Sequence, residues 1–202
     1  RDFCLSRGLG DVYKRQVTKD GDTVLGESVH YVLQPQASFV LIDQSSGYVK
    51  ALSGGRGQKE VSRSLNRATN TLRQPGSTFK VITSFAPAID TCGATLGSVY
   101  YDGPYTMDTK TFRNWYSSKG YMGYSTIRDG IVYSMNIVAV RCLMETVSPQ
   151  LGLEYAENFG ITTLTSQDLG ASQALGGLTH GTTNLELTAA YASTVSYTHL
   201  RA

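Results

Sequence analysis

Apolar and polar residues alternate over one part of the chain and recur at helical spacing over another. Between residues 38 and 53 they alternate on both sides of a turn at 44–47, where Gly47 supplies the positive φ that a tight turn needs. This pattern predicts a β-hairpin. After Gly76 the apolar residues of one face recur every three or four positions, which predicts a buried helix. They are Phe79, Ile82, Phe85, Ala86 and Ile89. We expect Pro87 to kink or end this helix before Cys92-Gly93.

Further helices are indicated by apolar spacing and by residues that begin or end helices. The Ser-Thr pair at 125–126 would cap a short helix, a second would follow over 137–144, and a third would span 149–160 up to a C-terminal glycine. The T-x-x-E pattern at 183–186 has the form of a capping box and predicts a helix through Ala192.

The tyrosine-rich segment 98–124 follows neither period. We expect its aromatic side chains, with Trp115, to be the packed walls of an irregular loop region; lining a cleft for an extended ligand is the alternative.

Hairpin and helices together predict an α+β fold, in which an antiparallel sheet packs against a mostly helical lobe. With 202 residues, 41% of them hydrophobic, the chain can form one core or most of one larger domain.

The turn before the buried helix carries a residue pair suited to acyl transfer. Pro75 and Gly76 read as a turn that opens into the helix, which puts Ser77 at or next to its N-terminus. Lys80 follows three residues later, so one helical turn brings both side chains to the same face. A neutral lysine can take the proton of a serine hydroxyl, and burial against Phe79 would lower the lysine pKa towards that state. The N–H groups of the helix N-terminus favour an oxyanion beside Ser77.

A plainer interpretation is that Ser77 only caps the helix and that Lys80 is solvated, because serine is a preferred N-cap and S-x-x-K recurs by chance. A second motif, Ser134-Met135-Asn136, lies between two apolar helical patterns. Its hydroxyl could relay a proton between the lysine and a leaving amine, and its carboxamide could hold a substrate peptide group or the lysine. The alternative is that Asn136 caps the helix that follows.

With both motifs in place, the sequence resembles the transpeptidase domain of penicillin-binding proteins, whose motif set is S-x-x-K, S-D-N and K-T-G. The hairpin at 37–55 and the approach at 65–77 also resemble this family. So does the run 174–181 followed by 185–187, which points to the bifunctional, class A branch. The resemblance covers about residues 36 to 195.

This resemblance implies a penicillin-binding protein/β-lactamase-like fold and a defined reaction. Ser77 would be the acylated nucleophile, Lys80 its general base, and Ser134 and Asn136 the second motif. Ser77 would attack the D-alanyl-D-alanine amide of a peptidoglycan stem peptide and release the terminal D-alanine. An amine of a neighbouring stem would then resolve the acyl-enzyme into a cross-link. β-Lactams would acylate Ser77 as substrate mimics, and neither a metal nor an organic cofactor is implied.

The resemblance also implies parts outside this sequence. A glycosyltransferase domain would lie upstream, and a membrane anchor would hold the protein at the extracytoplasmic face of the bacterial cytoplasmic membrane. No Lys-Thr-Gly or Lys-Ser-Gly follows Asn136, so the fold would be incomplete without the strand that carries the third motif in the family. We expect weak or no activity from the chain alone, because losing one oxyanion donor costs about a hundredfold or more.

Two other functions fit the same motifs. With water as acceptor the site would belong to a D,D-carboxypeptidase or a β-lactamase, although the hairpin and Gly176-Gly177 favour the transpeptidase. Outside enzymes, the chain would be a penicillin-sensing or wall-binding module. Analysis of the reaction products distinguishes such a hydrolase from a transpeptidase. A fluorescent penicillin that labels the wild type but not Ser77→Ala excludes an inactive module.

Both ends resemble translated adapter sequence and are set aside from the fold. We expect non-native tails at 1–16 and 196–202, a linker or pedestal remnant at 17–36, and a partial transpeptidase domain at 37–195. The tails account for five basic and two acidic residues of the totals of 18 and 16, which leaves 13 against 14 and a net charge of −1. The overall charge of +2 therefore indicates no nucleic-acid partner.

The remaining candidate ligands and nucleophiles favour structural roles. Cys92 and Cys142 form neither a zinc motif nor a disulfide framework, and Cys142 has the apolar neighbours of a buried free thiol. His180 is expected to be structural or merely adjacent to the cleft, because Lys80 already supplies a base and no G-x-S-x-G is present.

Overall fold

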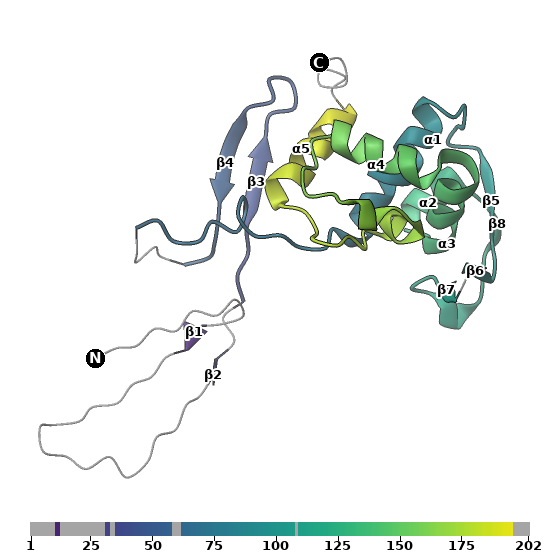
Figure 1. Ribbon diagram of the computed structural model, residues 1–202, viewed down its shortest axis with the longest axis horizontal. Helices are drawn as coiled ribbons and strands as arrows, with labels where there is room; N and C mark the ends of the chain where they lie inside the picture. The colour runs from purple at the N-terminus through teal and green to yellow at the C-terminus, as the bar shows by residue number, and fades with distance from the viewer. Residues whose placement is uncertain (1–10, 13–30, 33–34, 58–61, 108, 196–202) are drawn as a thin grey trace, which may run out of the picture. The chain divides into compact units, whose positions relative to one another are not determined.

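The computed structural model describes residues 11–12, 31–32, 35–57, 62–107 and 109–195. The chain divides into two units, residues 1–37 and Ser38–Ala202. In the first unit, β1 (Asp11–Val12) pairs antiparallel with β2 (Tyr31–Val32). The second unit holds all the other described elements (Figure 1). Most of the predicted linker, most of the first predicted tail and all of the second lie outside the described residues.

The predicted hairpin is present in the second unit. β3 (Phe39–Ile42) pairs antiparallel with β4 (Val49–Ser53), with a register irregularity between Leu41 and Ile42. β3 lies beside α5 (Asn184–Val195), as Figure 1 shows, and buries Val40. β4 is exposed along its whole length.

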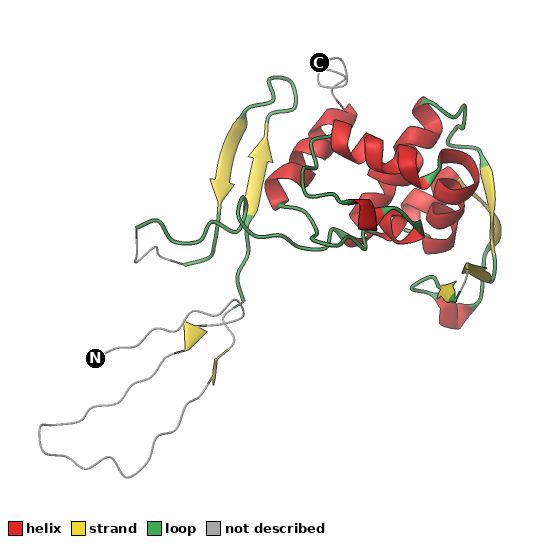
Figure 2. Ribbon diagram, in the orientation of Figure 1, coloured by secondary structure: helices red, strands yellow, loops and turns green. Residues whose placement is uncertain are grey.

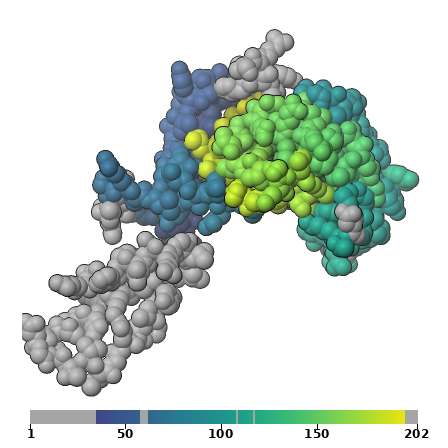
Figure 3. Space-filling model, viewed as in Figure 1, coloured from purple at the N-terminus to yellow at the C-terminus, as the bar shows by residue number. Residues whose placement is uncertain are grey.

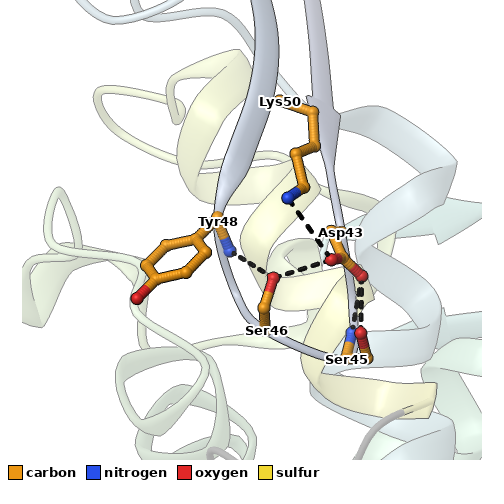
Figure 4. Close-up of polar contacts among 5 residues, drawn as sticks. All are labelled: Asp43, Ser45, Ser46, Tyr48 and Lys50. Carbon is orange, nitrogen blue, oxygen red and sulfur yellow. Dashed lines mark hydrogen bonds and ion pairs between the residues drawn. The ribbon is translucent and has the colours of Figure 1, made fainter.

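The turn of the hairpin is held by one carboxylate. Asp43 accepts hydrogen bonds of 2.7 Å from the hydroxyls of Ser45 and Ser46, and Lys50 lies 3.7 Å away (Figure 4). The hydrogen bonds from Ser45 and then Ser46 lower the pKa of Asp43 to about 2. Gly47 has a φ of 71°, as the turn predicted from sequence requires.

The helix predicted after Gly76 runs past Pro87 because its middle is π-helical. A 3₁₀ turn, η1 (Gly76–Thr78), leads into the π-helical η2 (Val81–Phe85) and then into α1 (Ala86–Asp90). Pro87 has no N–H to donate to the carbonyl four residues before it, and the wider π turn absorbs this gap. The helix therefore ends before Cys92-Gly93, as expected, but three residues beyond Pro87.

The other predicted helices also form, and those at 127–132, 149–158 and 184–195 have the expected caps. Thr126 and Asp129 make a capping box at the start of α2, and Thr183 and Glu186 make one at the start of α5. Gly160, with a φ of 91°, follows the end of α4. The helices and single turns of this region (Figure 2) are α2 (Ile127–Val132), α3 (Asn136–Arg141), the π-helical η4 (Cys142–Val147), α4 (Pro149–Asn158), η5 (Ser166–Asp168) and η6 (Ala171–Leu175).

The segment expected to be an irregular loop region contains two short antiparallel pairs, so that prediction was wrong. β5 (Val99–Asp102) pairs with β8 (Gly123–Thr126), and β6 (Tyr105–Met107) pairs with β7 (Lys110–Phe112). Strands of three or four residues are too short to display a clear period of two. In β5 a polar residue, Asp102, also occupies a buried position.

Two apolar clusters lie on either side of the helix that carries Ser77 and Lys80. Phe79 and Ile82 belong to one cluster, and Phe85 and Ala88 belong to the other. Residues from α3 onward form most of the face of the helical lobe seen in Figure 3. The helix is thus fixed along its length by burial on two sides, which holds its N-terminal turn in place. The cluster around Phe85 is completed mainly by Ile127, Met135, Val138 and Leu143, and the cluster around Phe79 by Tyr155, Phe159, Ile161, Leu178 and Ala190.

Candidate active site

Lys80 is a buried amine surrounded by oxygen acceptors. Its side chain is 2% exposed. Its Nζ donates hydrogen bonds of 2.6 Å to the carbonyl of Ser134, 3.0 Å to the Ser134 hydroxyl and 2.6 Å to Oδ1 of Asn136. Burial lowers the pKa of Lys80 to about 8. A substantial fraction of the amine is therefore neutral at mildly alkaline pH, as the expected role of a proton acceptor requires.

The second motif predicted from sequence is thus joined by direct hydrogen bonds to Lys80 of the first motif. Ser134 has a φ of 50°, a conformation that is uncommon for residues other than glycine and that allows the chain to turn sharply between α2 and α3. This turn aims both the carbonyl and the hydroxyl of Ser134 at the amine. Asn136 donates through Nδ2 to the carbonyl of Arg113 at 2.7 Å, which leaves its Oδ1 for Lys80.

The suggestion that Asn136 caps the helix after it is wrong. The N-cap position of α3 is occupied by Met135, which makes no side-chain cap, and Asn136 is the first residue of the helix. The missing cap comes from a distant residue. Oδ1 of Asn114 accepts the backbone N–H groups of Asn136 at 2.8 Å and of Ile137 at 3.2 Å.

Ser77 lies in the 3₁₀ turn η1, three residues before Lys80, at the position predicted from sequence. Its side chain is exposed, so a substrate can reach it from solvent. The turn is tight: Gly76 has a φ of 59°, and the hydroxyl of Thr78 donates to the carbonyl of Pro75 at 2.7 Å. Ser77 therefore stands at the open end of a helix whose next turn holds the buried amine.

The strand-like approach to Ser77 is clamped by residues from the far end of the chain. Arg73 and Thr182 form a β-bridge, with N–H to carbonyl distances of 3.0 and 2.9 Å. The carboxamide of Gln74 accepts from the backbone N–H of Leu178 at 2.7 Å and donates to its carbonyl.

Gly176 then packs directly on the backbone of Gly76. A Cβ on Gly176 would lie 2.3 Å from the Gly76 carbonyl oxygen. The sequence motif around Gly176-Gly177 thus holds the turn that carries Ser77 and does not itself enter the lysine cluster.

Two residues near the site were not singled out from sequence. Asp102 is fully buried, and its carboxylate accepts from Nδ2 of Asn114 at 2.6 Å. Asn114 belongs to the segment 98–124, which the sequence predicted to be an irregular loop region. The signal that could have found the pair is a charged residue at an inward-facing position of a short strand, together with a helix that lacks a polar N-cap.

Other candidates stay away from this cluster. Cys142 is buried as expected, and burial raises the pKa of its thiol to about 11. His180 is exposed, and among the described residues it is not a hydrogen-bond partner of Lys80. Within the described part of the chain, no three His, Cys, Asp or Glu side chains come together in a way that could hold a metal ion. The described helices are also all too short or too polar to cross a membrane.

Comparison with known proteins shows that this chain is similar to penicillin-binding proteins. Residues 37–201 match the family described as penicillin binding protein transpeptidase domain. A penicillin-binding protein 1A of Clostridium tetani is 37% identical over 174 residues, which cover 79% of this chain and 22% of that protein. The chain thus spans about a fifth of the length of such relatives.

Solved structures agree with the sequence relatives. The crystal structure of penicillin-binding protein 1A from Haemophilus influenzae aligns with a TM-score of 0.67 at 26% identity, covering 91% of this chain and 26% of that one. The penicillin-binding protein PonA1 from Mycobacterium tuberculosis aligns with a TM-score of 0.66 at 24% identity, covering 78% and 42%. The predicted penicillin-binding protein/β-lactamase-like fold is confirmed.

Proposed function

Because the chain belongs to the penicillin-binding protein transpeptidase domain family, we propose that it carries the acylation site of a peptidoglycan D,D-transpeptidase, with Ser77 as nucleophile. The observation that carries the proposal is the buried amine of Lys80, which is hydrogen-bonded to Ser134 and Asn136 and has a pKa of about 8. A structural lysine has no need of such burial, which works against its charge.

The hydrogen bonds suggest how the proton moves. A protonated amine has three N–H groups, and Lys80 directs them to three oxygens. When the amine is neutral it keeps two N–H groups and gains a lone pair. The carbonyl of Ser134 and Oδ1 of Asn136 can only accept, so they retain the two N–H groups. The Ser134 hydroxyl is the one of the three that can turn round and donate.

In the proposed reaction, the Ser77 oxygen attacks the carbonyl carbon of the penultimate D-alanine, and its proton passes to the neutral Lys80. The bond to the terminal D-alanine breaks as its nitrogen receives that proton through the Ser134 hydroxyl. An amine from a neighbouring stem peptide then attacks the carbonyl carbon of the ester. As the new amide forms, the bond from that carbon to the Ser77 oxygen breaks, and the proton that the amine loses returns to the Ser77 oxygen by way of Lys80. Asn136 keeps Lys80 oriented throughout by accepting one N–H.

The proposal extends to the partners of the whole protein. Its substrates would be peptidoglycan stem peptides, and β-lactams would acylate the same hydroxyl. A glycosyltransferase domain upstream, a membrane anchor outside this segment and an extracytoplasmic location would follow from the class A relatives. The third motif, absent from these 202 residues, would be needed for full activity.

The test is labelling with a fluorescent penicillin, in the longest natural polypeptide that contains this segment. We expect the wild type to be labelled covalently and Ser77→Ala to remain unlabelled. Ser64→Ala, which changes an exposed serine on the approach, serves as the matched control and should label like the wild type. Equal labelling of Ser77→Ala and the wild type would refute the assignment of the nucleophile. Release of D-alanine that requires an added amine acceptor separates a transpeptidase from a carboxypeptidase.

A further inference from the structure

The lysine cluster is connected to a buried carboxylate that plays no part in the reaction just proposed. From Lys80, the path runs to Asn136 at the start of α3, from there to the carboxamide of Asn114, and on to Asp102 in β5. Asp102 is 0% exposed and Asn114 is 3% exposed, so neither side chain is available to solvent. A buried carboxylate without a cationic partner is costly unless hydrogen bonds satisfy it.

Every oxygen of this path has an assigned partner. Oδ1 of Asp102 accepts from Nδ2 of Asn114 at 2.6 Å, while Oδ2 accepts from the hydroxyl of Tyr116 at 3.0 Å and from the backbone N–H of Met122 at 2.9 Å. Because the carboxylate can only accept, it forces the Nδ2 end of Asn114 towards itself. Oδ1 of Asn114 then has to face α3.

That orientation determines where the helix begins. The first N–H groups of a helix have no partner within it. In α3 the N-cap residue is Met135, which offers no oxygen, and Oδ1 of Asn114 accepts from Asn136 and Ile137 in its place. Asn136, fixed in this way, directs its own Oδ1 to the amine of Lys80.

We propose that Asp102 and Asn114 are positioning residues of the acylation site, which set the place and orientation of Asn136 and, through it, of the Lys80 amine. The proposal rests on the proposed function of Ser77 and Lys80. The same carboxylate also binds the backbone of Met122 and the hydroxyl of Tyr116, so it ties the aromatic segment before α2 to the start of α3.

The pair can be tested by exchanging its two members. In Asp102→Asn alone, the N–H₂ groups of the two carboxamides face each other with no acceptor between them. If Asn114 flips to avoid this, it turns its own N–H₂ against the N–H groups at the start of α3. In Asn114→Asp alone, two buried carboxylates face each other. The double variant Asp102→Asn/Asn114→Asp restores each bond. The carboxamide introduced in β5 donates to the side chain at position 114 and accepts from Tyr116 and Met122, and the carboxylate introduced at position 114 accepts the helix N–H groups.

The measurement is the rate of covalent labelling by a fluorescent penicillin between pH 6 and 10, in the longest natural polypeptide that contains this segment. We expect each single variant to react at least about tenfold more slowly, and the double variant to recover to within about threefold of the wild type. The exchange also moves a negative charge from β5 to the start of α3, towards Lys80. The labelling rate should increase with pH as Lys80 loses its proton, and the midpoint of this increase should therefore move up by about half a pH unit in the double variant. Asn70→Asp, the same change at an exposed turn, should leave rate and midpoint unaltered.

Amide hydrogen exchange at Asn136 and Ile137 provides a readout that does not depend on activity. Protection should fall about tenfold or more in each single variant and return in the double variant. Single variants that react and exchange like the wild type would overturn the proposal. So would a folded double variant that is no faster than the slower single variant. If the wild type itself does not label at Ser77, the proposed function fails, whereas the exchange data still decide whether the pair positions Asn136.

Discussion

Replacing Lys80 by methionine should remove a contribution to stability that grows as the pH rises from 7 to 10. The change keeps the length and apolar stem of the side chain and removes its titrating amine. In the folded chain the pKa of Lys80 is about 8 because of burial, whereas the ordinary value for lysine is 10.5. Between these two pH values, the unfolded chain binds a proton that the folded chain does not.

The sign follows from proton linkage. Where the unfolded state binds more protons, the free energy of unfolding rises with pH. For folded and unfolded pKa values of about 8 and 10.5, the gain from pH 7 to pH 10 is on the order of 2 kcal/mol. Tyr100 and Cys142, whose pKa values burial raises to about 12 and about 11, act in the opposite direction. Their effect is common to both proteins and cancels in the difference between the wild type and Lys80→Met.

The assay is urea denaturation followed by circular dichroism at pH 7, 8.5 and 10. We expect the unfolding free energy of the wild type, relative to Lys80→Met, to increase by about 2 kcal/mol over this range. Lys119→Met, which removes an exposed lysine of η3 (Ser117–Lys119), should follow the wild type. Parallel pH dependences of the wild type and Lys80→Met would show that the amine is not held in a charge-disfavouring site, and the reasoning would fail.

Three further predictions concern the frame around the site. Gly176→Ala would place a Cβ 2.3 Å from the Gly76 carbonyl oxygen, at a φ of 69°. We expect the free energy of unfolding, measured by thermal denaturation, to fall by about 2–4 kcal/mol and acylation to become slower. A variant as stable as the wild type would contradict the close packing of Gly176 on Gly76. Burial opposes ionisation of Glu186, but hydrogen bonds from Thr162 and Thr183 outweigh it and lower its pKa to about 2. The contribution of the ionised Glu186 carboxylate to the free energy of unfolding is therefore complete above pH 4.5 and lost as the pH falls through about 2. Glu186→Gln should be less stable than the wild type at pH 6, and this difference in stability should be smaller near pH 2. Cys142 should resist alkylation at pH 8 while the half-buried Cys92 reacts, as read by peptide mapping; equal rates would show that Cys142 is not enclosed.

The features of the site that could be predicted from the sequence depend on residues that are close together along the chain. Ser77 and Lys80 are three residues apart on one helix, so their proximity follows from helical geometry alone. The burial of Lys80 follows from the apolar residues around it. The caps of α2 and α5 are likewise local, since each joins residues three positions apart.

The parts that sequence could not supply depend on contacts between distant residues. Asn114 caps a helix that begins 22 residues later, and no spacing rule connects a carboxamide to a helix so far along the chain. The packing of Gly176 on Gly76 is of the same kind. The continuation of the helix through Pro87, directly after the π-helical η2, was also missed, because proline is read as a helix breaker unless a wider turn accommodates it.

The pH dependence of acylation at Ser77 tests the central claim most directly. The measurement is the rate at which a β-lactam modifies the peptide that contains Ser77, followed by mass spectrometry from pH 6 to 10 in the longest natural polypeptide that carries this segment. If the free amine of Lys80 accepts the proton, the rate should rise through a midpoint near pH 8, and Lys80→Met should abolish the reaction. A rate that stays flat across this range, or modification of another residue in place of Ser77, would contradict the account.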